Sequence, residues 1–416
     1  MRTGVPTITM KSCLLVNYFY AMNDPVSRQA ATSLADAGWQ VNVFHAPPGD
    51  GHSSSVPTSV RAFECPGPTF SIPIGPLYRI AKWHKFRREL QLWIKTNRPE
   101  LVVTIMLHAL AALPDDPDQP FSLVSCVYDI PSPRDAGRLD SQIFRKGWNR
   151  LRDADVVWSS DVYKAELARE FGKLGRSPLV CHNCPPIHDL PKPTWPRDPW
   201  LRTELRRQGA EICDQSCILL RAGAVGECGG IEATLEALRR LPGEYIFLMM
   251  GRPTREYQTK LLARIAELGL RNRAFLWEQP SDEAWNKALQ GADVGHLIHG
   301  PFPPGRMQRL YELNSSLSNN RLFLYLAAGL PVLSYDDSRL DAIHKEVDCF
   351  RVLQVDNLVE EMYQALLEMG NPALRMKLGE AGRKAHERRY SWEYQFGNVL
   401  GAISQNKESG CAEIDR

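Results

Sequence analysis

Short apolar runs alternate with longer amphipathic stretches along the whole chain. Residues 13–17, 101–105 and 217–222 are almost continuously apolar, as expected of strands that are buried on both faces. Between such runs, apolar positions recur with helical spacing, as in residues 25–38, where Asp24 is placed to cap a helix with Pro25 in its first turn. This alternation predicts an α/β fold in which helices cover both faces of a parallel sheet.

The pattern runs through two successive series. The first half adds predicted strands at 40–44, 122–128, 156–159 and 178–182 and helices at 78–97, 141–154 and 161–171. The second half adds strands at 245–250, 274–277, 294–298 and 332–334 and helices at 230–241, 255–268, 281–290, 321–328, 358–368 and 372–390. Two such series predict two Rossmann-like, doubly wound domains that face each other across a cleft, with ligands at the carboxyl ends of the strands.

A proline-rich, polar stretch over residues 185–199 separates the two series. We therefore expect an N-terminal domain over residues 1–190, a linker over 191–212, a C-terminal domain over 213–388, and a final helix and tail over 389–416.

The composition excludes several classes of protein. The net charge of +2 over 416 residues, without a nucleic-acid-binding motif, predicts no nucleic-acid partner. No apolar run reaches the roughly 18–20 residues of a membrane helix, and the first residues lack a secretory signal, so a cytoplasmic protein is expected. Cys181 and Cys184, with Cys213 and Cys217 downstream, form two close-spaced pairs of the kind that zinc sites use. Several cysteines, however, lie in apolar runs. Reduced core or turn cysteines are therefore favoured over a metal site, and no metal is predicted.

Residues 318–332, SNNRLFLYLAAGLPV, carry the clearest chemical signal. Ser318 or Asn319 is placed to cap a helix that begins near Asn320, and its exposed N–H groups would bind a diphosphate. Arg321 in the first turn would add a charge-assisted hydrogen bond to phosphate. The alternative is a capped core helix with an incidental arginine.

A glycine-rich turn over residues 221–230 follows the first strand of the second half. Gly223 and Gly226 would let backbone N–H groups approach a phosphate or a sugar closely. Arg221 and Arg252, like Arg321, are candidates for binding the diphosphate, and each has an ordinary surface position as its alternative.

The order of these pieces resembles family 4 of the retaining GT-B glycosyltransferases. The resemblance rests on residues 318–332, on GADVG at 291–295, on HNCP at 182–185, on residues 24–44, and on YSWE at 390–393. It implies transfer of a sugar from a nucleoside-diphosphate sugar, such as a UDP or GDP sugar, to a small-molecule acceptor, such as a natural product, or to a glycan acceptor bound by the first domain. It further implies a final helix that crosses back to the first domain, and catalysis without a protein nucleophile, a metal or a cofactor. The oligomeric state is left open.

Three of the chain's departures from the family bear most directly on the donor. Many members carry basic residues where this chain has Ala224 and Gly229, and usually a ribose-holding glutamate where it has Leu324. These losses suggest an unusual donor. They also keep two alternatives open, a catalytically degenerate binding or partner subunit and a GT-B sugar epimerase.

Candidates for the acceptor side follow two strands of the first half. His108 comes after residues 101–105 and Asp129 follows residues 122–128, and we treat both as catalytic candidates. A core histidine and a turn aspartate are their alternatives. The basic helix over residues 77–90 would allow peripheral contact with an anionic membrane at its inner face, although its apolar stripe also suits a core-facing helix.

Overall fold

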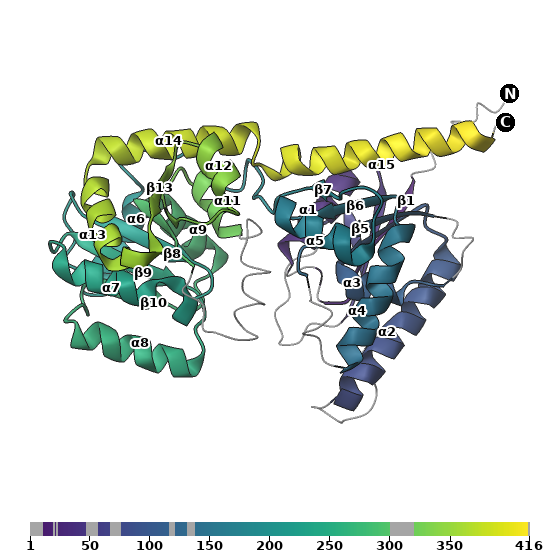
Figure 1. The fold of residues 1–416 in the computed structure, drawn as a ribbon, viewed down its shortest axis with the longest axis horizontal. Helices are drawn as coiled ribbons and strands as arrows, with labels where there is room; N and C mark the ends of the chain where they lie inside the picture. Colours follow the sequence, from purple (N-terminus) through teal and green to yellow (C-terminus); the bar gives the residue numbers. More distant parts are fainter. Residues whose placement is uncertain are drawn as a thin grey trace. The chain divides into compact units, whose positions relative to one another are not determined.

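The computed structural model describes residues 11–19, 21, 24–46, 57–66, 76–115, 121–130, 138–299 and 320–414. The chain divides into two compact units. The first unit comprises Met1–Asn183 together with Gln395–Arg416, and the second comprises Cys184–Tyr394. Each unit contains one sheet of parallel strands with helices packed around it (Figure 1). The α/β class with two Rossmann-like sheets is therefore confirmed.

In the first unit, the strands lie in the order β3-β2-β1-β4-β5-β6-β7. Their bounds are Ser12–Asn17 (β1), Gln40–His45 (β2), Val60–Glu64 (β3), Leu101–Ile105 (β4), Ser122–Cys126 (β5), Val156–Ser159 (β6) and Leu179–Val180 (β7). The helices are Pro25–Asp36 (α1), Pro76–Asn97 (α2), Met106–Ala112 (α3), Arg138–Arg150 (α4) and Val162–Gly172 (α5). The strand order reverses between β1 and β4, where Asn17 pairs with Ile105. Such a reversal opens a crevice for ligands at the carboxyl ends of the two strands.

The second unit repeats this arrangement in the order β10-β9-β8-β11-β12-β13. Its strands are Cys217–Ala222 (β8), Tyr245–Met250 (β9), Ala274–Trp277 (β10), Val294–Leu297 (β11), Val332–Tyr335 (β12) and Phe350–Leu353 (β13). Its helices are Pro199–Arg207 (α6), Ile231–Arg240 (α7), Arg255–Glu267 (α8), Asp282–Gly291 (α9), Asn320–Ala327 (α11), Asp341–Glu346 (α12), Leu358–Met369 (α13) and Pro372–Arg388 (α14). Here the order reverses between β8 and β11.

Some elements escaped prediction for identifiable reasons. Strand β3 lies at the edge of its sheet and has four exposed residues, so it lacks an apolar pattern. Helix α3 follows β4 without a connecting segment, and the two form one continuous apolar run. The segment 191–212 contains helix α6, whose Leu201 and Leu205 are buried in the core of the second unit.

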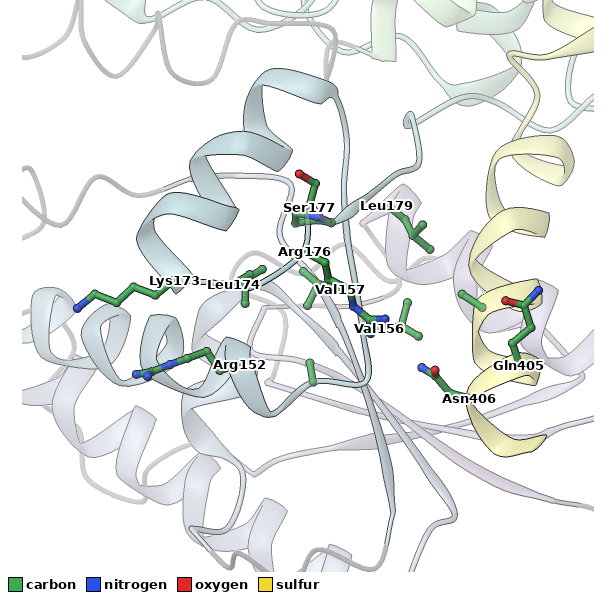
Figure 2. Close-up of a pocket in the computed structure, with 14 residues that line it drawn as sticks. Arg152, Val156, Val157, Lys173, Leu174, Arg176, Ser177, Leu179, Gln405 and Asn406 are labelled. Carbon is green, nitrogen blue, oxygen red and sulfur yellow. The ribbon is translucent and has the colours of Figure 1, made fainter. Parts of the chain in front are cut away.

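The last helix, α15 (Trp392–Ile414), crosses back into the first unit, as the resemblance implied. Its Phe396, Val399 and Ile403 are buried, and the Phe396 ring lies edge-on to that of Trp158, with 5.8 Å between centroids. Beside this contact, α15 and the segment before β7 border a hollow of about 670 Å³ (Figure 2). The hollow lies at the starts of β6 and β7, away from the carboxyl ends where ligands are expected.

Within the described parts of the chain, no helix is both long and apolar enough to span a membrane. The apolar stripe of α2 faces inward, because Trp83, Phe86 and Leu90 are buried in the first unit. Contact of the basic face of α2 with a membrane stays a prediction.

Asp293 ties several elements of the second unit together. Its carboxylate accepts from the Ile218 amide at 2.9 Å and from Arg202 Nη2 at 2.8 Å, and Arg375 Nε lies 3.6 Å away. Asp293 and Arg375 are almost fully buried. One carboxylate thus joins β8, α6 and α14 in the core, next to the start of β11.

We expect Asp293→Asn to lower the free energy of unfolding by about 3–5 kcal/mol, because it leaves the buried Arg375 guanidinium without its counter-ion. Urea unfolding followed by circular dichroism measures this. Asp214→Asn, at an exposed position of the same unit, is the matched control. A loss below about 1 kcal/mol for Asp293→Asn would contradict the role given to this carboxylate.

Candidate functional site

The strand-order reversal of the second unit brings Gly223 and Arg321 together. Gly223 follows β8 directly and has a φ of +109°, a conformation that a side chain rarely tolerates. A Cβ atom on Gly223 would lie only 2.9 Å from Nη2 of Arg321. Glycine is therefore needed here both for the turn and for the close approach of the guanidinium.

Arg321 lies in the first turn of α11 and is 4% exposed. Its Nε donates to the Ala222 carbonyl oxygen, and Nη2 lies 3.5 Å from that of Ala224. Nη1 is buried and has no hydrogen-bond partner in the described part of the chain. Burial lowers the pKa of Arg321, which reflects the cost of holding this cation away from water. A buried cationic donor without an acceptor is costly unless an anion completes the site.

A second guanidinium, that of Arg221, anchors the glycine-rich turn from inside. Arg221 is 2% exposed; its Nε donates to the Ala224 carbonyl at 3.1 Å, and its Nη1 to those of Gly229 and Ile298, both at 3.0 Å. A Cβ atom on Gly229 would lie 2.6 Å from Nη2 of Arg221. The guanidinium of residue 221 thus fills the volume in which a side chain of residue 229 would begin.

Sequence reasoning missed His296, which lies beneath this turn. Its Nδ1 is 3.1 Å from Nη1 of Arg221, and its Nε2 is 3.0 Å from Oγ1 of Thr234. Because Arg221 can only donate and Thr234 already donates to the Gly230 carbonyl at 2.8 Å, the ring is neutral with its proton on Nε2. Burial, and then the charges of the two arginines, hold the pKa of His296 well below its ordinary value. A histidine inside an apolar strand pattern carries no signal of this role.

The start of α7 completes the arrangement. Gly230 precedes this helix with a φ of +62°, and no side chain caps its first N–H groups. Within the described residues, neither Arg221 nor Arg321 forms an ion pair with a carboxylate. Their charges therefore oppose one another, and the charge of Arg321 contributes to the lowered pKa of Arg221. Two buried cations beside an uncapped helix start suit a doubly charged anion such as a diphosphate.

Helix α11 is also fixed at its far end. Arg197 Nη1 donates to the Ala328 carbonyl at 2.8 Å, and Arg383 Nη1 donates to that of Ala327. These are the last carbonyls of α11, where cations are favoured by the helix dipole. Side chains from outside the helix thus determine how Arg321 is presented at its first turn.

The other donor-site candidates lie as follows. Gly226 has an extended backbone with open space around its Cα, and Arg252 is exposed just after β9. Asn320 is half-buried at the start of α11, and Leu324 packs partly buried against the core. Ser318 and Asn319 lie outside the described residues.

In the first unit, His108 lies near the corresponding reversal between β1 and β4. Helix α3 starts directly after β4 because Met106 adopts a left-handed φ of +73°, which is uncommon for a bulky residue. This turn places His108 against Tyr18, with ring centroids 5.3 Å apart and planes 12° apart. The imidazole also lies edge-on to Phe19 and Phe144.

Asp129 follows β5 and is largely exposed. Its carboxylate lies 3.7 Å from Nζ of Lys164, a lysine with no exposed surface that also donates to the Tyr128 carbonyl. Burial lowers the pKa of Lys164, while Asp129 and Asp161 oppose that shift. Lys164 therefore holds the segment that carries Asp129.

The four cysteines considered as zinc ligands differ in burial. Cys181, Cys184 and Cys217 are buried, whereas Cys213 is exposed. Among the described residues, no group of three or more histidine, cysteine, aspartate or glutamate side chains is placed to hold a metal ion.

No family model and no curated protein matches the sequence. Solved structures match it along nearly the whole chain. Sucrose-phosphate synthase from Thermosynechococcus elongatus has a TM-score of 0.69 at 16% identity, covering 96% of this chain and 100% of that one. HepE from Anabaena, solved with UDP and glucose, has a TM-score of 0.64 at 15% identity and coverages of 95% and 100%. WaaG, a glycosyltransferase involved in lipopolysaccharide biosynthesis, has a TM-score of 0.62 at 15% identity, covering 93% of this chain and 98% of that one. The chain has the GT-B fold.

The GT-B likeness extends beyond transferases. A candidate UDP-N-acetylglucosamine 2-epimerase from Listeria monocytogenes has a TM-score of 0.58 at 12% identity, covering 96% of this chain and 97% of that one. At such identities the likeness establishes the fold alone, so the function must be argued from the site.

Gly229→Ala should lower the free energy of unfolding by about 1–3 kcal/mol, because its Cβ atom displaces the Arg221 guanidinium. In an Arg221→Met background the same substitution should cost clearly less, which a double-mutant cycle in urea detects. Gly226→Ala is the control, since its Cβ atom enters open space. Equal costs in both backgrounds would refute the shared volume.

Stability should fall as the pH falls below about 6.5. His296 and His386 are fully buried, and burial lowers the pKa of both in the folded protein. The unfolded chain therefore binds more protons below its ordinary histidine pKa, and stability present above that pH is lost at about 1.4 kcal/mol per pH unit for each histidine. Urea unfolding between pH 7.5 and 5.5 measures the slope.

His386→Gln tests this slope at one site. Its side-chain amide can keep a bond to the Pro185 carbonyl, which His386 Nε2 contacts at 3.1 Å, but it does not titrate. The variant should show a slope smaller by about one proton, and an unchanged slope would exclude His386 as a contributor.

Proposed function

We propose that this protein is a retaining, metal-independent glycosyltransferase that moves a sugar from a nucleoside-diphosphate sugar to a small-molecule or glycan acceptor. The observation that carries the proposal is the buried Nη1 of Arg321 beside the glycine-rich turn, which has no hydrogen-bond partner among the described residues. A diphosphate would supply the missing acceptor and the negative charge that Arg221 and Arg321 lack. The GT-B fold makes a nucleotide sugar the most natural source of that diphosphate, as in HepE solved with UDP and glucose.

The chemistry that such a site favours is stabilisation of a leaving group. The acceptor hydroxyl forms a bond to the anomeric carbon while the bond from that carbon to the diphosphate oxygen breaks. The hydroxyl proton passes to the departing phosphate on the same face of the sugar. Arg321 and the N–H groups at the start of α7 would offset the charge that develops on the diphosphate, without a protein nucleophile. On the acceptor side, His108 and Asp129 remain the candidates for contact with the reacting groups.

The rival function is a binding subunit that holds the nucleotide sugar without turning it over. Leu324 favours this rival, because it packs against the core where the family usually places a ribose-holding carboxylate. Leucine cannot accept a hydrogen bond, so the ribose must be held differently or more weakly. Binding and turnover therefore have to be measured separately.

Calorimetry of the whole chain against UDP-, GDP-, ADP- and dTDP-sugars tests the donor site. Arg321→Ala should weaken binding roughly tenfold to a hundredfold, because a charge-assisted bond to phosphate is lost. The matched control is Arg239→Ala, an exposed arginine in the last turn of α7. A melting curve of each variant separates lost binding from lost folding.

If no nucleotide sugar binds, the donor site proposal fails. If one binds and Arg321→Ala leaves its affinity unchanged in a folded variant, Arg321 does not contact the diphosphate. Binding without transfer or donor hydrolysis would favour the binding subunit.

A further inference from the structure

The two units have the same topology at their strand-order reversals but opposite chemistry. In the second unit, the crevice between β8 and β11 is lined by glycine and by two buried guanidinium groups. In the first unit, Tyr18 and Phe19 follow β1, and the imidazole of His108, just after β4, packs against both rings. We propose that this aromatic cluster is the acceptor-binding surface and that it takes an uncharged ring by stacking, which makes the acceptor a neutral sugar or aromatic alcohol.

Phe19 presents an exposed ring just after the carboxyl end of β1. Half of its surface is exposed. Its backbone N–H donates to Oδ1 of Asn17 at 2.9 Å, and Asn17 is 1% exposed. The Asn17 amide nitrogen in turn donates to Ser27 Oγ at 2.8 Å and to Asp24 Oδ2 at 3.1 Å. The backbone that carries the ring is thus held by a buried network, and the ring itself packs edge-on to Tyr18 and His108, which reduces the conformational entropy lost when a ligand stacks on it.

The same network occupies the N–H groups at the start of α1, which could otherwise bind a phosphate. In Rossmann-like folds, the helix after the first strand offers its N–H groups to anions. Here Asp24 accepts from the amides of Val26 and Ser27 and occupies that position with its own carboxylate. Burial raises the pKa of Asp24, whereas its hydrogen bonds to Ser27, Val26 and Tyr128 oppose the shift. The equivalent helix of the second unit, α7, has no side-chain cap.

Two charged groups near the cluster already have partners among the described residues. Lys82 Nζ lies over the Tyr18 ring, 6.0 Å from the centroid. Asp129 lies beside Lys164. What the described residues at this end of β1 offer a ligand is therefore chiefly aromatic surface, which stacks on the apolar face of a pyranose or on an aromatic ring. The assignment of this ring to the acceptor rests on the proposed function.

The test uses ligand-observed NMR titrations of the whole chain, without donor. The probes are methyl β-D-glucopyranoside, phenyl β-D-glucopyranoside and glucose 6-phosphate. We expect both glucosides to bind and Phe19→Ala to weaken them about tenfold, as expected for the loss of one stacking ring. Phe19→Tyr should retain the binding. Phe63→Ala removes another exposed phenylalanine of this unit, on β3, and should leave the binding unchanged.

The outcomes distinguish a sugar ring from an aromatic ring as the part of the acceptor that stacks on Phe19. Equal affinity for the two glucosides indicates a sugar ring, tighter binding of the phenyl compound indicates an aromatic ring, and both support the proposal. The proposal is overturned if wild-type protein binds neither glucoside, if Phe19→Ala binds them as tightly as the wild type, or if glucose 6-phosphate binds more tightly than the glucosides. Because no donor is present, failure of nucleotide sugars to bind in calorimetry would sink the proposed function and leave this result intact.

Discussion

The hydrogen bonds of buried guanidinium groups determine where α11 lies, and the donor site depends on α11. Arg197 and Arg383 bind the last carbonyls of this helix, while Arg321 extends from its first turn to the Ala222 carbonyl. Asp293 holds Arg202 and Arg375 elsewhere in the same core. Each of the other four arginines donates to backbone or carboxylate oxygens through an Nη atom. Among the described residues, Nη1 of Arg321 and Nε of Arg197 and Arg375 have no hydrogen-bond partner. Arg321 lies at the carboxyl edge of the sheet, next to Gly223 after β8.

A second consequence of this arrangement concerns the positions where the family usually carries basic residues. A cation at residue 229 would collide with Arg221, whose guanidinium fills that volume from the neighbouring strand. The positive charge has not been lost from the turn but enters it from β8. The guanidinium of Arg221, however, donates its hydrogen bonds to carbonyl oxygens of the protein. It therefore stabilises the turn and is less available to bind a phosphate. Leu324 has no acidic counterpart within α11 itself, since Asn320–Ala327 contains no aspartate or glutamate.

Much of the fold followed from the sequence because buried parallel strands are continuously apolar. The capping of α1 by Asp24 was accessible in the same way, since it depends on local turn chemistry. The close approach of Arg321 to Gly223 was not, because it joins segments that are far apart in the chain. The edge strand β3 and helix α3 were not, because one lacks an apolar pattern and the other continues one.

The parts of the candidate sites that could not be predicted depend on contacts between distant segments. His296 acquires its tautomer from Arg221 and Thr234, which lie 75 and 62 residues away in the chain. Phe19 is one of three consecutive aromatic residues in the sequence, and only its exposure in the structure distinguishes it. Burial and tertiary hydrogen bonds of this kind leave no periodic signal in the sequence.

The return of α15 to the first unit affects how the protein is made. Phe396, Val399 and Ile403 fill the core of a unit whose other residues precede position 184. During synthesis those other residues leave the ribosome long before α15 does. The core of the first unit therefore stays incomplete, with apolar surface uncovered, while the whole second unit is synthesised. The second unit, continuous in sequence, can complete its own core earlier. The half of the protein that is translated first is therefore the half that finishes folding last.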